Sequence, residues 1–237
     1  MVSQYSRDFE LREAERDLFG RHLIPGMSIL DLGVGGGRTT AYLAESAARY
    51  VGVDISEAMV RACMARYPNE RFELCDASDL SRFPDEDFDA VVFSFNGIDY
   101  LTAEGRSRCL SEVARVLVAG GKFIFSSHNA RHLAFAPRLR DASVFRGVLR
   151  IGRAGVRSVP LAARTMRAGC FRTGEGYTWD PEYGGIWTYV STPATLKPQL
   201  SAAGFEVADI ISGARPDPKP MWFTPYYHYA CTRAARS

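Results

Sequence analysis

Cysteine is scarce in this sequence, and long apolar runs are missing from it. The 237 residues include five cysteines with no C-x-x-C pair: Cys63, Cys75, Cys109, Cys170 and Cys231. An odd, scattered set of this kind is typical of free buried thiols in a reducing compartment and argues against zinc. No stretch approaches the roughly eighteen apolar residues of a transmembrane helix, and the polar first residues lack the core of a signal peptide. We therefore expect a cytoplasmic protein with no bound metal.

Repeats and low-complexity linkers are also missing, which favours a single domain over residues 1–237. Hydrophobic residues make up 46% of the chain and charged residues 24%, ordinary values for a globular protein. A chain of this length can bury a sizeable core.

Short apolar segments alternate with helical patterns through most of the chain. This alternation predicts βαβ units and a mostly parallel sheet covered by helices on both faces. The expected strands are 28–32, 50–54, 72–75, 88–95, 121–127, 206–211 and 227–232. The expected helices are 7–23, 37–48, 56–66, 104–117 and 192–203, with Gly120-Gly121 as the stop of the fourth.

A glycine-rich turn follows the first expected strand. Four glycines occur within residues 33–37, where backbone can approach a ligand closely at a helix start. A dinucleotide fingerprint would need glycine where Arg38 stands, and a phosphate-binding P-loop would need a lysine that is absent nearby. Asp31 precedes the turn; its charge would repel a pyrophosphate but suits a ligand that carries an ammonium and a sulfonium.

Three further motifs end the following strands. Asp54 closes the second strand, where an acidic residue can accept hydrogen bonds from both ribose hydroxyls. Cys75-Asp76-Ala77 closes the third, and the run from Phe88 to Gly97 spans the fourth. Together with the glycine turn, these motifs resemble the class I S-adenosylmethionine-dependent methyltransferases over residues 20–130 and 192–233.

The resemblance implies a Rossmann-like, doubly wound, seven-stranded and mostly parallel sheet with an antiparallel last strand. It also implies S-adenosylmethionine as cofactor and S-adenosylhomocysteine as product. The residues that it would place around the cofactor run from the methionine end through the ribose and adenine to the reacting methyl: Asp31, Gly33, Val34, Gly35, Asp54, Ile55, Met59, Asp76, Ala77, Phe95 and Asn96.

Methyl transfer to a hydroxyl usually needs a base in reach of the acceptor. His128 is the preferred base because a neutral imidazole can take a proton near pH 7. Asp99 is the second catalytic candidate. For each, a purely structural role is the alternative.

The residues after the fourth strand narrow the choice of acceptor. The chain has Asn96-Gly97-Ile98-Asp99 where enzymes that methylate planar amino groups show an Asn/Asp-Pro-Pro-aromatic run. We therefore expect no nucleic-acid substrate. Residues 93–101 and 124–129 resemble methyltransferases of bacterial surface-polysaccharide biosynthesis, which implies a small-molecule or glycan hydroxyl as acceptor.

An arginine-rich segment interrupts the pattern after the fifth strand. Residues 130–173 hold ten arginines and one acidic residue, Asp141, with leucine and phenylalanine interleaved. We expect a basic helical insertion within a lid of about 130–190. Its arginines could be solvated or paired with acidic residues elsewhere on the fold, could bind an anionic or lipid-linked acceptor, or could contact an acidic membrane surface or nucleic acid. An aromatic stretch comes next, from Tyr177 to Tyr189, as an acceptor wall or a packed hairpin.

Three other functions stay open from the sequence. The protein could methylate the nitrogen of a small amine or amino sugar with the same cofactor. It could bind the cofactor as a partner protein without turnover. An NAD-dependent dehydrogenase is the third alternative, because the ribose-binding aspartate is common to both cofactor classes. The oligomeric state is not predicted.

Overall fold

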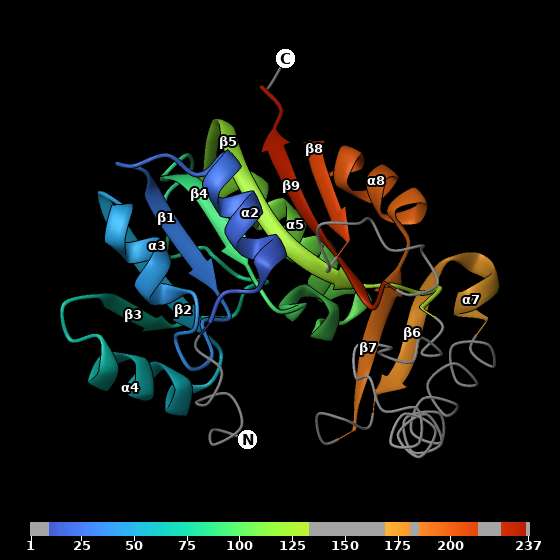
Figure 1. The fold of residues 1–237 in the computed structure, drawn as a ribbon, viewed down its shortest axis with the longest axis horizontal. Coiled ribbons are helices and arrows are strands. Elements are labelled where there is room, and N and C mark those ends of the chain that lie inside the picture. Colours follow the sequence, from blue (N-terminus) through green and yellow to red (C-terminus); the bar gives the residue numbers. More distant parts are fainter. Residues whose placement is uncertain (1–9, 133–168, 181–184, 213–223, 236–237) are drawn as a thin grey trace, which may run out of the picture.

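A seven-stranded sheet forms the centre of the fold (Figure 1). The computed structural model describes residues 10–132, 169–180, 185–212 and 224–235. The sheet order is β3-β2-β1-β4-β5-β9-β8, with β9 antiparallel to both neighbours and the remaining pairs parallel. The bounds are β1 Ser28–Leu32, β2 Arg49–Asp54, β3 Arg71–Leu74, β4 Phe88–Phe93, β5 Leu117–His128, β8 Phe205–Ser212 and β9 Tyr226–Arg233. The predicted Rossmann-like sheet with an antiparallel last strand is confirmed.

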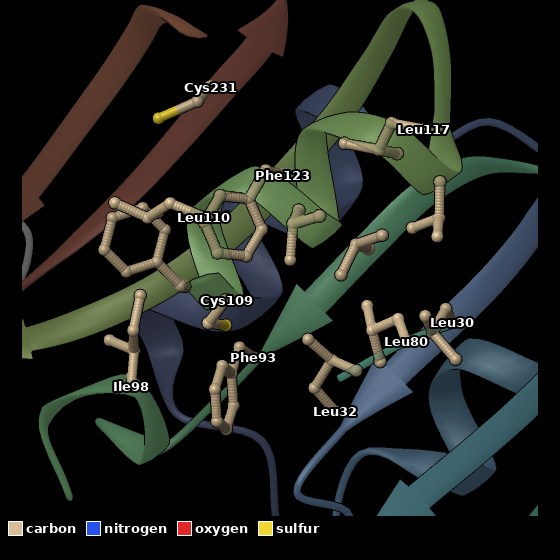
Figure 2. Packing of buried hydrophobic residues seen from close by; sticks show 14 of the residues in the cluster. Leu30, Leu32, Leu80, Phe93, Ile98, Cys109, Leu110, Leu117, Phe123 and Cys231 are labelled. Atoms are coloured by element: carbon tan, nitrogen blue, oxygen red, sulfur yellow. The ribbon is translucent and has the colours of Figure 1, made fainter. Parts of the chain in front are cut away.

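Helices cover both faces of the sheet and complete a three-layer arrangement. On one face lie α2 (Glu13–His22), α3 (Thr40–Ser46) and α4 (Glu57–Arg66); on the other lie α5 (Ala103–Val116) and α8 (Pro193–Ala202). Alternation along β1 explains the division, because successive strand side chains point to opposite faces. Ile29 packs with Phe19 of α2, whereas Leu30 packs into the cluster that holds Cys109 and Leu110 of α5 (Figure 2).

Two expected boundaries are wrong in position. The helix expected over 104–117 ends at Val116, and the glycine pair lies inside β5 instead of stopping the helix. The β4–β5 register shifts between Phe88 and Ala90, and Gly120 has a φ of +78° in the opposing stretch. The glycines therefore lie in a β-bulge of β5, where an unusual backbone conformation is needed. The helix expected from residue 37 begins at Thr40, because the glycine turn extends further.

The aromatic stretch forms a separate β-hairpin. Strands β6 (Glu175–Asp180) and β7 (Ile186–Ser191) pair only with each other in ladders, after the short helix α7 (Cys170–Thr173). An isolated bridge between Asn129 and Ser191 connects the hairpin to the end of β5. Most of the expected basic insertion, residues 133–168, lies outside the described residues. None of the helices in the described ranges combines the length and the apolar character that crossing a membrane requires.

Phe123 provides a test of the core on the α5 face. Its side chain is fully buried within this cluster (Figure 2). The ring stacks on Phe125 with the ring centroids 4.6 Å apart. We expect Phe123→Ala to lower the free energy of unfolding by about 3–5 kcal/mol, because the cavity cannot fully collapse. Urea denaturation followed by circular dichroism measures this loss. Ile24→Ala, at an exposed position, is the control and should change stability little. A loss below about 1 kcal/mol for Phe123→Ala would contradict the packing described.

Candidate functional site

The candidate residues converge on the carboxyl edge of the sheet. Asp31, Asp54 and His128 lie at or next to the ends of β1, β2 and β5. Asp76 follows β3, and Asn96 follows β4. Because parallel strands end at the same edge, residues that are far apart in sequence gather there, where open α/β sheets bind ligands.

The glycine turn adopts a backbone that only glycine accommodates easily. Gly33, Gly35 and Gly37 have φ values of +62°, +54° and +78°. A Cβ on Gly33 would lie 2.9 Å from the Phe93 ring. The Gly35 amide donates to Asp54 Oδ2 at 2.9 Å, so the turn is tied to the end of β2. This geometry leaves the turn as a cradle along the edge.

Asp31 is buried beneath this cradle. Thr39 Oγ1 and the Tyr50 hydroxyl donate to its Oδ2 at 2.6 and 2.9 Å. Oδ1 is buried and has no hydrogen-bond partner among the described residues. Burial raises the pKa of Asp31 to about 6, although the two donors lower it. A buried carboxylate oxygen without a partner fits a cationic ligand group, and S-adenosylmethionine carries an ammonium and a sulfonium.

The ribose and adenine candidates line the edge beyond β2 and β3. Asp54 Oδ1 accepts from the Ser56 amide at 2.8 Å. Ile55 is 71% exposed next to it, whereas Met59 is buried. Asp76 Oδ1 accepts from the Ser78 amide and hydroxyl at 2.8 and 2.9 Å, which shapes the turn after β3, and Ala77 packs against the core. An exposed aliphatic side chain between two acidic turns suits the flat face of an adenine, and these assignments stay predictions.

Phe95 and Asn96 hold an unusual backbone at the end of β4. Their φ values are +56° and +59°, a left-handed conformation that is rare for residues other than glycine. The backbone N–H of Asn96 donates to Ser126 Oγ at 2.9 Å. The side-chain Oδ1 of Asn96 is buried and lacks a hydrogen-bond partner within the described residues. Such conformations cluster at functional sites, where the surrounding structure maintains them. This segment turns the chain from the cofactor side of the edge toward the acceptor side.

His128 and Asp99, expected as separate candidates, form a hydrogen-bonded pair. Asp99 lies in the 3₁₀ helix η1 (Gly97–Tyr100) and is fully buried. His128 Nδ1 lies 2.8 Å from Asp99 Oδ2, and the His128 amide donates to the same oxygen at 2.6 Å. The other ring nitrogen, Nε2, lies 3.3 Å from the side-chain nitrogen of Asn96. A carboxylate on Nδ1 fixes the ring so that Nε2 is the nitrogen left to take up a proton.

One supporting residue, Arg106, was missed by the sequence reasoning. Arg106 Nη1 and Ser127 Oγ donate to Asp99 Oδ1 at 3.3 and 2.8 Å. Arg106 did carry a signal, because it shares a helical face with buried Cys109 and Val113. An arginine on the apolar stripe of a helix indicates a buried partner. Ser127 lies in the segment 124–129 that the sequence already singled out.

Helix α2 closes the cofactor side with a buried ion pair. Arg38, at the end of the glycine turn, contacts both carboxylate oxygens of Glu15 at 2.5 and 2.6 Å. Burial is the largest single influence and raises the pKa of Glu15, but Arg38, His228 and the Arg12 backbone amide together lower it below its ordinary value. Arg12 and Arg38 also lie over the Phe95 ring, 4.8 and 5.6 Å from its centroid. The residue that argued against a dinucleotide site therefore anchors the N-terminal helix.

The sheet order and the glycine turn define the Rossmann-like fold of the S-adenosylmethionine-dependent methyltransferases. Residues 29–121 match a family model described as "Methyltransferase domain". Two solved structures share the fold at low sequence identity. One is 1,6-didemethyltoxoflavin-N1-methyltransferase of Burkholderia thailandensis with bound S-adenosylhomocysteine (TM-score 0.63, 18% identity, 99% of this chain and 81% of that one). The other is an S-adenosylmethionine-dependent methyltransferase of Mesorhizobium loti (TM-score 0.64, 20% identity, 93% and 98%).

Sequence relatives match part of the chain. A demethylmenaquinone methyltransferase of Clavibacter sepedonicus is 38% identical over 104 residues, 43% of this chain and 41% of that protein. A fatty-acid O-methyltransferase of Mycolicibacterium smegmatis is 34% identical over 113 residues, 46% and 40% of the two chains. The matches span about half the length of these relatives or less. The fold is therefore that of the S-adenosylmethionine-dependent methyltransferases.

The raised pKa of Asp31 predicts a pH-dependent stability. Below about pH 4 the side chain is protonated in both folded and unfolded protein, since its ordinary pKa is 3.8. Between about pH 4 and 6 the unfolded chain loses the proton first, so stability falls as pH rises, by at most about 1.4 kcal/mol per unit. We expect Asp31→Asn to remove this slope in urea titrations of the ligand-free protein, while the exposed Asp85→Asn keeps it. A wild-type slope in Asp31→Asn would contradict the assignment.

Proposed function

We propose that this protein transfers the methyl group of S-adenosylmethionine to a hydroxyl of a small molecule or glycan, with His128 as general base. The observation that carries the proposal is the His128–Asp99 pair at the carboxyl edge, next to the turn at Asn96. The pair lies on the side of the edge away from the Asp54 end. Catalysis by such an enzyme rests on alignment of acceptor and methyl, together with removal of the acceptor proton.

The cofactor supplies an electrophilic methyl group on a sulfonium, and this chain's residues would hold it by its other parts. Asp31 would face the cationic methionine end, and the backbone of Gly33, Val34 and Gly35 would follow it. Asp54 would accept from the ribose hydroxyls. The adenine would lie among Ile55, Met59, Asp76 and Ala77, and the backbone of Phe95 and Asn96 would flank the methionine end and the reacting methyl.

The chemistry of the acceptor then falls to His128. Asp99 accepts from Nδ1 and orients the ring. Nε2 would therefore take the proton of the acceptor hydroxyl as the acceptor oxygen bonds to the methyl carbon and the bond from that carbon to sulfur breaks, which leaves S-adenosylhomocysteine. The Asn96 amide next to Nε2 can donate to the neutral ring or, turned over, accept from the protonated one. Asp99 stabilises the protonated imidazole by its charge.

An apolar or ring-bearing acceptor fits the surroundings and the relatives. Relatives named for demethylmenaquinone and fatty-acid methylation support an acceptor of low polarity. The aromatic side chains of Tyr177 and Tyr189 lie in contact on one face of the β6–β7 hairpin, with ring centroids 5.3 Å apart. Tyr177 reaches the backbone carbonyl of Leu101, just past η1, with its hydroxyl at 2.8 Å. We also include two other acceptors in the proposal. One is a surface-polysaccharide precursor, and the other is an anionic or lipid-linked acceptor bound through residues 130–173.

A nitrogen acceptor is the alternative within this fold, and a cofactor-binding protein without turnover is the alternative outside it. The oriented Nε2 favours an enzyme over a binding protein, because binding the cofactor alone needs no base. Incubating cell extract with methyl-labelled cofactor and identifying the labelled product by mass spectrometry distinguishes O- from N-methylation. Tight cofactor binding with no labelled product would favour the binding protein.

We also propose a cytoplasmic location, because no disulfide forms among the described residues and four of the five cysteines are buried.

Replacing the base should abolish most turnover. We expect His128→Ala to reduce release of S-adenosylhomocysteine by about two to four orders of magnitude, because the acceptor proton has no other base oriented toward it among the described residues. Calorimetry should show unchanged cofactor affinity. His22→Ala, on α2 beside Asp209, is the matched control. A normal rate in His128→Ala would remove His128 as base while leaving the cofactor assignment intact.

Replacing the ribose partner should act on binding instead. We expect Asp54→Asn to weaken S-adenosylmethionine binding by about tenfold or more, because a charge-assisted hydrogen bond is worth roughly 1.5–3 kcal/mol. Calorimetry measures the affinity directly. Glu57→Gln, at an exposed position at the start of α4, is the control. Equal affinity in Asp54→Asn and wild type would contradict the proposal that Asp54 binds the ribose hydroxyls.

A further inference from the structure

Arg106 lies directly behind the His128–Asp99 pair. It comes from the first turn of α5 and is 4% exposed. Its Nη1 donates to Asp99 Oδ1 at 3.3 Å and to the Ile98 carbonyl at 3.2 Å. Its guanidinium carbon lies 3.8 Å from the centroid of the Tyr189 ring. The side chain therefore connects α5 to η1 and to the hairpin at one point.

Stability alone does not explain this arrangement. Nη2 of Arg106 is buried without a hydrogen-bond partner in the part of the chain that the structure describes. Leaving a buried donor unpaired is costly, and apolar residues of similar volume often replace a buried ion pair at no loss. Asp99 already accepts from Ser127 Oγ, the His128 amide and His128 Nδ1. The guanidinium adds charge and orientation to a carboxylate that has other donors.

We propose that Arg106 is a positioning residue that holds the Asp99 carboxylate in place and sets the pH at which His128 takes up a proton. Two N–H contacts fix η1, so Oδ2 stays aimed at His128 Nδ1. The positive charge of Arg106 offsets part of the negative charge of Asp99. The protonated imidazole is therefore a better proton donor than it would be if Asp99 lacked the charge of Arg106 behind it. This inference rests on the proposed role of His128 as base.

The groups around His128 allow the effect to be isolated. Asp99 contacts His128 directly, and Arg106 contacts Asp99 from behind. The Tyr100 ring packs against the His128 ring, and Tyr226 of β9 is the cross-strand partner of His128, with Arg12 over the Tyr226 ring. Three further phenols lie around Asp99 and Arg106: Tyr177 from β6, Tyr189 from β7 and Tyr229 from β9. Burial raises the pKa of Tyr177, Tyr189 and Tyr229, so these three stay neutral in the range in which an imidazole titrates.

A titration of His128 by nuclear magnetic resonance tests the proposal without any acceptor. The chain has four histidines, so the Cε1–H signal of His128 can be assigned by its loss in His128→Ala. We expect Arg106→Met to raise the midpoint of the His128 titration by about one pH unit, because it removes a positive charge behind Asp99. Arg108→Met is the matched control: Arg108 lies on the same helix, exposed, and pairs with Glu104. Its titration should match that of wild type.

Three outcomes would decide the matter. An unchanged or lowered midpoint in a folded Arg106→Met protein would overturn the proposal. If that variant does not fold, Arg106→Gln, which keeps planar N–H donors without charge, should show the same upward shift. Loss of fold in both would assign Arg106 to stability and also overturn it. A raised His128 midpoint in Arg106→Met, together with full turnover in His128→Ala, would support the coupling between Arg106 and His128 but reject His128 as the base.

Discussion

The β5 end of the sheet edge depends on the hydrogen bonds to one buried carboxylate, Asp99. Removing an ionised carboxylate from water costs free energy unless its oxygens have partners. Two elements supply partners to Asp99, which lies on η1: β5 brings Ser127 and His128, and α5 brings Arg106. Ser127 Oγ also lies 3.1 Å from Ser191 Oγ at the end of β7. The hydrogen bonds that satisfy one side chain therefore hold His128 in place and help to orient the hairpin.

Asp31 is the opposite case at the same edge of the sheet. It is equally buried, yet one of its oxygens has no partner among the described residues, and burial raises its pKa to about 6. A cation at that oxygen would complete its environment, whereas Asp99 needs nothing further. The two aspartates thus differ in how fully the surrounding residues satisfy their oxygens. Residue type alone does not distinguish them; the supply of local donors does.

The positions of the proposed cofactor residues at the sheet edge were predictable from the sequence because their determinants are local. Each residue there, from Asp31 to Asp76, lies at the end of its own strand, and strand ends can be recognised from short apolar runs. The contact between Asp99 and His128 was not predicted, although both were candidates, because it depends on how η1 packs against β5. Arg106 depends on the same tertiary packing. Gly120 and Gly121 led to a wrong prediction of the helix end, because glycine is favoured both where a helix stops and in a β-bulge.

The proposed cofactor site and the β5 end of the sheet edge meet at Phe95 and Asn96, and this explains why the strained backbone there is kept. A left-handed residue other than glycine costs about 1–3 kcal/mol, less for asparagine than for phenylalanine. The surroundings hold both in place. Arg12 and Arg38 lie against the Phe95 ring from the cofactor side, and Ser126 accepts from the Asn96 amide on the acceptor side. Because Asn96 also lies beside Nε2 of His128, any shift of the segment toward the glycine turn would move the neighbour of the proposed base. The proposed cofactor site and the environment of the proposed base are thereby connected through two residues.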